Sequence, residues 1–202
     1  MKTKLCISVF VLLILRLTGF SQTYIGPIIG YSLSEIVETQ EALHGDCPTN
    51  DWLFNKEGYL RNSIMYGFRV EKAIFARLNI SFQADYRRQK LVDDNCRSFD
   101  LKYNILSSSL LLNANVYRSF NIGIGATYSY HHNYNFGDSY IKHENFLGYA
   151  LAVSYKFKNI MINLSYKALK NIDKDNQYYY RMILSSRSFE LSASYMFELF
   201  KK

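Results

Sequence analysis

The stretch Ala-Arg-Leu-Asn-Ile-Ser-Phe-Gln-Ala-Asp-Tyr-Arg, residues 76–87, alternates apolar and polar side chains without interruption. Successive side chains of a β-strand point to opposite faces of a sheet, so this period of two gives a strand with one apolar face and one polar face. Leu78, Ile80 and Phe82 share the apolar face, whereas Asp85 lies on the polar one. The segment therefore predicts a strand that separates an apolar environment from a polar one.

Seven other segments show the same alternation along the chain. They are residues 24–33, 60–70, 98–117, 122–130, 147–157, 160–167 and 188–197. In residues 98–117 the apolar parity switches at Ile105 and Leu106, which predicts a β-bulge at that point.

The connections between these segments alternate in length. Short ones span residues 71–74, 118–119 and 158–159, and long ones span residues 34–59, 89–97, 131–145 and 170–186. Eight strands joined in this way predict an all-β fold, an eight-stranded antiparallel up-and-down transmembrane β-barrel. Short turns of such barrels lie in the periplasm and long loops lie outside, so both termini are expected in the periplasm of a Gram-negative cell.

The first 21 residues predict a signal peptide. Lys2 and Lys4 precede an apolar run over residues 5–15, and small residues stand at 19 and 21. The run is too short to span a bilayer, which takes roughly 20 apolar residues. We expect cleavage after Ser21 and a single barrel domain over residues 22–202, with an uncleaved anchor as the alternative.

The polar faces are predicted to line the barrel interior, because Gly, Ala and Ser occur on them together with charges of both signs. A soluble, lipocalin-like barrel would have the opposite arrangement, with its apolar faces inward. The charged residues expected to form an interior network are Arg61, Arg69, Arg77, Asp85, Arg87, Lys156, Lys167 and Glu190. Eight strands leave an interior that side chains fill, so we expect no open pore. A salt-bridged plug is favoured, with a proton path or substrate site as the alternative.

Composition agrees with export. The chain has 18 Tyr and 14 Phe but only 2 Pro, which suits strands with aromatic girdles. The net charge of +7 falls to +4 when Lys2, Lys4 and Arg16 leave with the signal, and no basic stripe indicates a nucleic-acid partner. Cys47 and Cys96 fall in the first two long loops, so they are expected on the same side of the membrane. A disulfide between them is favoured over two free thiols.

Three stretches carry a family resemblance: Gly-Phe-Ser-Gln at 19–22, Ile-Gly-Pro-Ile-Ile-Gly-Tyr-Ser at 25–32, and Phe-Glu-Leu-Ser-Ala-Ser-Tyr-Met-Phe at 189–197. With them the chain resembles the porin-like outer-membrane β-barrel domains, the OmpA/OmpX-like and PorT-like group. That family typically ends on an aromatic residue, whereas this chain continues to Lys202, so Phe197 or Phe200 would serve as the assembly signal. The resemblance implies the cell outer membrane as location, with lipid and lipopolysaccharide as surroundings.

The function that these features favour is structural or surface-binding, through the outer loops. Aromatic residues of the loops are expected either to contact a partner or surface sugars, or to pack on one another. An accessory role in a secretion machine, with other envelope proteins as partners, is an alternative that the PorT-like resemblance permits.

A lipid A-modifying enzyme is a further alternative. Its candidate residues are Ser129 and His131, which share a face of one strand, with His132 beside them and Asp138 or Glu144 as the acid. A single Ser-x-His is weak support, so no catalysis is expected. No cofactor is expected. Metal binding by His131, His132 and His143 is an alternative, but no ligand spacing among them is compelling, so no metal site is expected.

Overall fold

The computed structural model describes residues 22–40, 58–92, 102–133, 143–172 and 182–199. The expected signal peptide and the two loop cysteines, Cys47 and Cys96, lie outside these ranges. Long antiparallel strands make up nearly all of the described chain. They are β1 (Thr23–Gln40), β2 (Gly58–Phe75), β3 (Leu78–Val92), β4 (Lys102–Tyr117), β5 (Phe120–Asn133), β6 (His143–Phe157), β7 (Ile160–Asn171), β8 (Met182–Tyr195) and the two-residue β9 (Phe197–Glu198).

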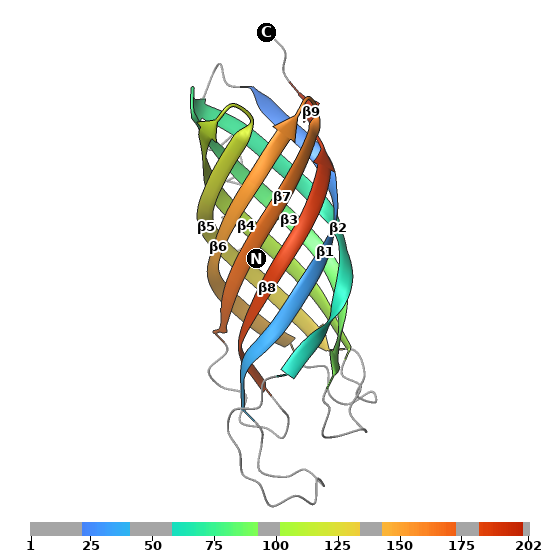
Figure 1. Cartoon of the computed structure of the whole chain (residues 1–202). Helices are drawn as coiled ribbons and strands as arrows, with labels where there is room; N and C mark the ends of the chain where they lie inside the picture. The colour runs from blue at the N-terminus through green and yellow to red at the C-terminus, as the bar shows by residue number, and fades with distance from the viewer. Residues whose placement is uncertain (1–21, 41–57, 93–101, 134–142, 173–181, 200–202) are drawn as a thin grey trace, which may run out of the picture.

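The strands close into one barrel (Figure 1). Each of β1 to β7 pairs with the next strand along the chain, and β1 pairs with both β2 and β8, which joins the two edges. The short β9 follows Met196 and continues the line of β8 along β1. The predicted eight-stranded antiparallel up-and-down barrel is thereby confirmed. Within the described ranges, no helix has the length and apolar character needed to cross a membrane.

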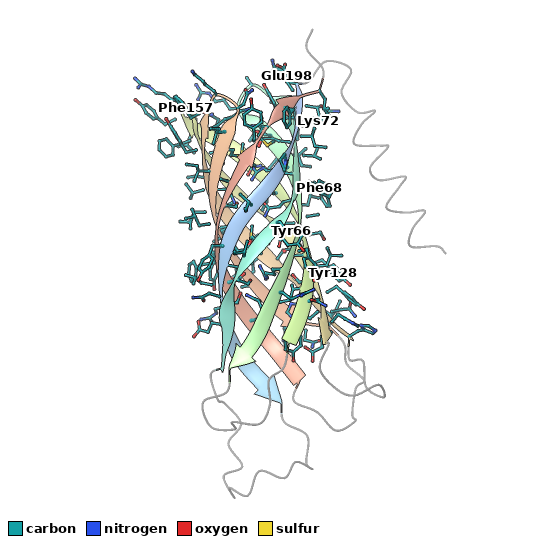
Figure 2. The ribbon with its side chains drawn as sticks, turned by 90° about the vertical axis from the view of Figure 1, so that its right-hand side faces the viewer. Tyr66, Phe68, Lys72, Tyr128, Phe157 and Glu198 are labelled. Atoms are coloured by element: carbon teal, nitrogen blue, oxygen red, sulfur yellow. The ribbon has the colours of Figure 1, made fainter. Side chains whose placement is uncertain are left out.

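Large apolar side chains cover the outside of the barrel. In β6, the outward Leu147, Tyr149 and Leu151 are 51, 52 and 44% exposed, whereas the intervening Ala150 and Ala152 are buried. Tyr66, Phe68 and Phe157 project away from the wall in the same way (Figure 2). The predicted alternation is confirmed along the described parts of the strands, with the apolar face outward.

The two ends of the barrel differ in how the strands are joined. At one end, called the turn end below, two-residue turns join β2 to β3, β4 to β5 and β6 to β7. At the other, the loop end, the strands run into the residues drawn in grey in Figure 1. The first turn lies at residues 76–77 rather than the predicted 71–74, because β2 continues to Phe75.

Inward-facing glycines let neighbouring strands approach closely. A Cβ atom at Gly67 would lie 1.9 Å from the carbonyl oxygen of Ala84, and one at Gly125 would lie 1.8 Å from that of Leu110. Any larger residue at either position would push backbone against backbone. These positions therefore explain part of the glycine content of the predicted interior face.

The predicted bulge in β4 is wrong. Pairing with β3 runs without a register shift from Leu78 and Ala114 at one end to Lys90 and Lys102 at the other. Instead of shifting the backbone, Tyr103 and Ile105 point inward and are buried. The interior near the loop end accepts apolar side chains, so the change of parity reflects what fills the barrel there.

Candidate functional site

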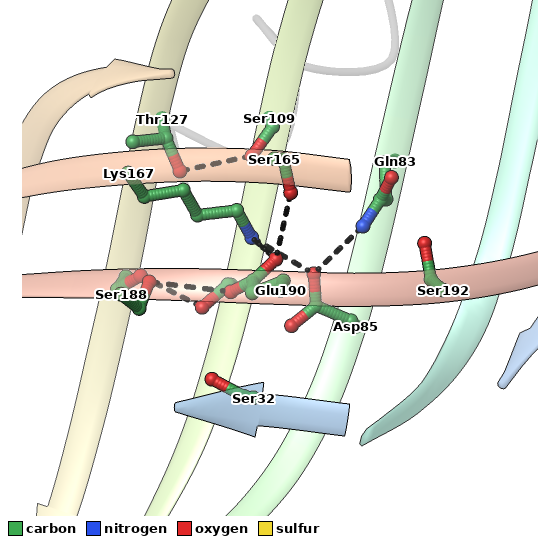
Figure 3. A network of polar contacts seen from close by, with 12 residues as sticks. Ser32, Gln83, Asp85, Ser109, Thr127, Ser165, Lys167, Ser188, Glu190 and Ser192 are labelled. Carbon is green, nitrogen blue, oxygen red and sulfur yellow. Dashed lines mark hydrogen bonds and ion pairs between the residues drawn. The ribbon is translucent and has the colours of Figure 1, made fainter. Parts of the chain in front are cut away.

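Four charged side chains meet across the middle of the interior. Figure 3 shows three of them, Asp85, Lys167 and Glu190. Asp85 and Arg87 come from β3, Lys167 from β7 and Glu190 from β8. The Lys167 Nζ atom lies 3.2 Å from Asp85 Oδ2 and 2.8 Å from Glu190 Oε2, and the Arg87 guanidinium pairs with Glu190 Oε1. Since β3 lies opposite β7 in the strand order, this network links opposing walls of the barrel.

Neutral polar side chains complete the central network. The Gln83 amide donates a hydrogen bond to Asp85 Oδ2 over 3.4 Å, and the Ser165 hydroxyl donates to Glu190 Oε2 over 3.4 Å. All four charged groups are at most 2% exposed. Charges this deeply buried are tolerated only when they are paired and hydrogen-bonded. The network therefore fills and holds the centre of the barrel.

A second network lies closer to the turn end. Arg69 Nη2 lies 3.4 Å from Glu71 Oε2 and donates to the Ser81 hydroxyl over 3.3 Å, and the Asn79 amide donates to Glu71 Oε1 over 3.3 Å. Sequence reasoning missed Glu71, which it assigned to a turn, although it is buried inside the barrel. Lys72 is buried as well, but it is the next residue of β2 and pairs with Ile80, so it lies on the outer face. An acidic residue two positions after the inward Arg69 was the available signal.

The charges of the described interior side chains nearly balance. The acidic ones are Glu71, Asp85, Glu144 and Glu190, and the basic ones are Arg69, Arg87 and Lys167. Opposite charges in nearly equal number limit the net charge of this part of the interior.

The remaining residues of the predicted network lie elsewhere. Arg77 is exposed in the β2–β3 turn, so placing it on the interior face is wrong; the barrel wall ends before it, at Phe75. Lys156 is half-buried near the turn end, with its Nζ atom 3.6 Å from the centre of the Tyr24 ring. Arg61 belongs to β2, but its side chain lies outside the described set.

Ser129 and His131 point inward together, but they form no catalytic relay. The Ser129 hydroxyl is hydrogen-bonded to that of Ser107 over 2.7 Å, and neither ring nitrogen of His131 has a hydrogen-bond partner among the described residues. The His131 ring packs instead on Phe146, with ring centres 4.2 Å apart. Both residues are at most 1% exposed, which removes them from a lipid substrate at the barrel surface.

The other acids and histidines of the predicted rim site divide between the two faces. Glu144 opposes His131 across β5 and β6 and is buried in the interior. His132 and His143 form the neighbouring cross-strand pair and point outward. Asp138 lies outside the described residues. The alternation of the strands thus separates His131 from the other two histidines.

The chain was compared with known proteins. No family model and no curated protein matches it. Among solved structures, Neisserial surface protein A is 15% identical with a TM-score of 0.54, over 88% of this chain and 99% of that one. AlkL, solved in lipid bilayers, is 15% identical with a TM-score of 0.53, over 92% of this chain and 95% of that one.

The Ail protein of Yersinia pestis is similar to the same degree. It is 14% identical with a TM-score of 0.52, over 87% of this chain and 99% of that one. Identities this low show a shared fold and leave activity open. The chain therefore has the fold of the small eight-stranded transmembrane β-barrels of outer membranes.

Proposed function

We propose that the protein is exported by a signal peptide at residues 1–21 and resides in the outer membrane as a closed barrel. In this proposal its role is structural or surface-binding, exerted through the loop end. The observation that carries the proposal is the apolar exterior: outward side chains such as Ile124, Leu151 and Leu191 are 61, 44 and 56% exposed. Exposed apolar surface this continuous fits a lipid environment and would cause aggregation in water.

The filled interior argues against transport through the barrel. The ion pairs among Asp85, Arg87, Lys167 and Glu190 cross the axis, and the described charges of the interior nearly balance. Moving a solute through would require breaking these pairs in a poorly solvated interior, which is costly. The charge network thus acts as a plug that stabilises the barrel, and we assign it no proton path or substrate.

Strand length supports a role for the loop end. A bilayer is crossed by about 9–11 residues of a tilted strand, whereas β1 and β2 each have 18 residues. Because the turns at the other end are tight, the excess length stands beyond the lipid at the loop end. That end is expected at the cell surface, among lipopolysaccharide, with the turns and both termini in the periplasm.

The connecting segments at the loop end are rich in acids. Residues 41–57, 93–101, 134–142 and 173–181 together carry ten acidic and five basic residues. One neighbour of this fold, Ail, was solved in complex with sucrose octasulfate, a polyanionic heparin analogue. Acid-rich segments in this chain favour a different class of partner, one that is cationic or is bridged by metal cations.

Two experiments test the proposal. An epitope inserted in residues 134–142 should be labelled by antibody on intact cells, whereas the same epitope between Arg118 and Ser119 should be labelled only after the outer membrane is opened. The reverse pattern would overturn the orientation. The purified protein in a planar bilayer should show no sustained conductance, and stable open channels would refute the plug.

A further inference from the structure

The outer face of the loop end carries two histidines that meet across a pair of strands. His132 near the end of β5 directly opposes His143, the first residue of β6. Their imidazole rings are stacked, with centres 4.8 Å apart and an interplanar angle of 22°. The two Nδ1 atoms lie 3.0 Å from each other. Two nitrogen donors are therefore held on one surface by the register of the barrel.

We propose that His132 and His143 bind a divalent transition-metal ion, such as Zn²⁺, Ni²⁺ or Cu²⁺, through their Nδ1 atoms. Metal–nitrogen bonds of about 2.0–2.1 Å place two ligands of one tetrahedral ion about 3.3 Å apart. The observed separation of 3.0 Å is close to that value. Binding would require the two stacked rings to rotate so that both Nδ1 lone pairs point at one ion.

A tyrosine supplies a third donor to the same place. Tyr130 lies on the same face as His132, two residues earlier in β5, and its hydroxyl is hydrogen-bonded to Nδ1 of His143. The Tyr130 and His143 rings are stacked, with centres 5.3 Å apart. One phenol oxygen and two imidazole nitrogens thus converge, a donor set that suits zinc, copper and nickel better than calcium or magnesium.

The strands below hold this arrangement in position. The hydroxyl of Tyr128, one step further from the loop end on the same face, is hydrogen-bonded to Asn145 of β6. Figure 2 shows Tyr128 projecting from the outer surface of the barrel. Ligands carried by paired strands are more precisely placed than ligands on loops, so less ordering accompanies ion binding.

The composition of the connecting sequence favours a cation. Residues 41–57, 93–101, 134–142 and 173–181 carry twice as many acidic as basic residues. A surplus of negative charge raises the local concentration of cations and their rate of association. His131 does not contribute, because it points into the interior between Tyr103 and Phe146.

The test uses the full mature chain refolded in detergent micelles, titrated with Zn²⁺, Ni²⁺ and Cu²⁺ by calorimetry. We expect Cu²⁺ to bind most tightly, following the order of stability of divalent metals on nitrogen ligands. His132→Asn and His143→Asn should each weaken binding by a factor on the order of 10–100, since losing one of two nitrogen ligands is at least as severe as losing a supporting partner. Electron paramagnetic resonance of the Cu²⁺ form should show two coordinated nitrogens.

A control comes from the remaining histidine of the chain. His44 lies in residues 41–57, outside the described residues, and His44→Asn should leave the affinity for each metal unchanged. Every variant is first shown to give the faster-migrating unboiled gel band of a folded barrel. The proposal is overturned if His132→Asn and His143→Asn bind metal as the parent does, if His44→Asn loses as much, or if Ca²⁺ displaces the metal. Calcium competition would assign the binding to carboxylates of the connecting segments.

Discussion

The turn end and the loop end of this barrel are made from the same strands but carry opposite chemistry. At the turn end, Arg118 directly follows the outward Tyr117, with its Cζ atom 5.1 Å from the ring centre. Lys158 likewise follows Phe157, with its Nζ atom 5.7 Å from that ring. At the loop end, the outer face carries histidines, and the adjoining segments are acidic.

The barrel interior also differs between the two ends. Toward the turn end it holds the polar cluster of Arg69, Glu71 and Ser81, whereas toward the loop end His131 packs on Phe146 beside Tyr103. A two-residue turn fixes its side chains at the boundary of the lipid, where aromatic rings and cations are favourable. The loop end stands beyond that constraint. This difference agrees with the proposed function, in which the turn end anchors the barrel and the loop end carries recognition.

The largest effect is expected from breaking the central charge network, which lies between the two ends of the barrel. In Glu190→Ala, Lys167 keeps its pair with Asp85, but Arg87 loses its carboxylate partner inside the barrel. We expect the free energy of unfolding to fall by about 3–5 kcal/mol, as for other broken buried ion pairs. Urea unfolding of the refolded protein in micelles measures it. The exposed Glu198 of β9 provides the control, and Glu198→Ala should change stability by less than about 0.5 kcal/mol.

Placing the same charge at two positions along one strand compares the middle of the barrel wall with its turn end. Leu151 lies in the middle of β6 and Phe157 at its turn end, and both point outward. Arg in place of Leu151 should cost about 2–4 kcal/mol, while Arg in place of Phe157 should cost at most about 1 kcal/mol. Equal effects of the two substitutions on unfolding in lipid vesicles would mean that the outward face does not cross a bilayer.

The alternation of apolar and polar residues predicted the barrel correctly because one environment, lipid, contacts the outer face of the strands. Every outward position must be apolar to lie in lipid, so residues such as Leu147 to Phe157 of β6 alternate cleanly. The interior obeys a different rule, since side chains of any polarity fill it when they are packed or paired. Tyr103 and Ile105 point into the interior although they are apolar, and this produced the mistaken bulge.

Charged residues near strand ends were assigned to connections for a related reason. Glu71 and Glu144 are typical of turns and loops in sequence, yet they lie inside the barrel at the ends of β2 and β6. Glu71 contacts Asn79 of β3 as well as Arg69 of its own strand, and Glu144 opposes His131 of β5. Contacts between strands are invisible in one sequence. The direct contact of His132 with His143, without His131, also depends on the register of β5 and β6.

The smallest expected effect concerns the backbone of the turns. Arg118 and Lys158 have positive φ angles of 47° and 52°, in the left-handed region that favours glycine. Relieving the Cβ contact in Arg118→Gly should stabilise the barrel by about 0.5–1 kcal/mol, and Ser119→Gly, whose φ is not positive, should not. The stabilised variant would also lack the cation beside Tyr117, so its insertion into vesicles with anionic lipid should slow. A gain in stability with unchanged insertion would show that the positive charge of Arg118 has no role in anchoring the turn end.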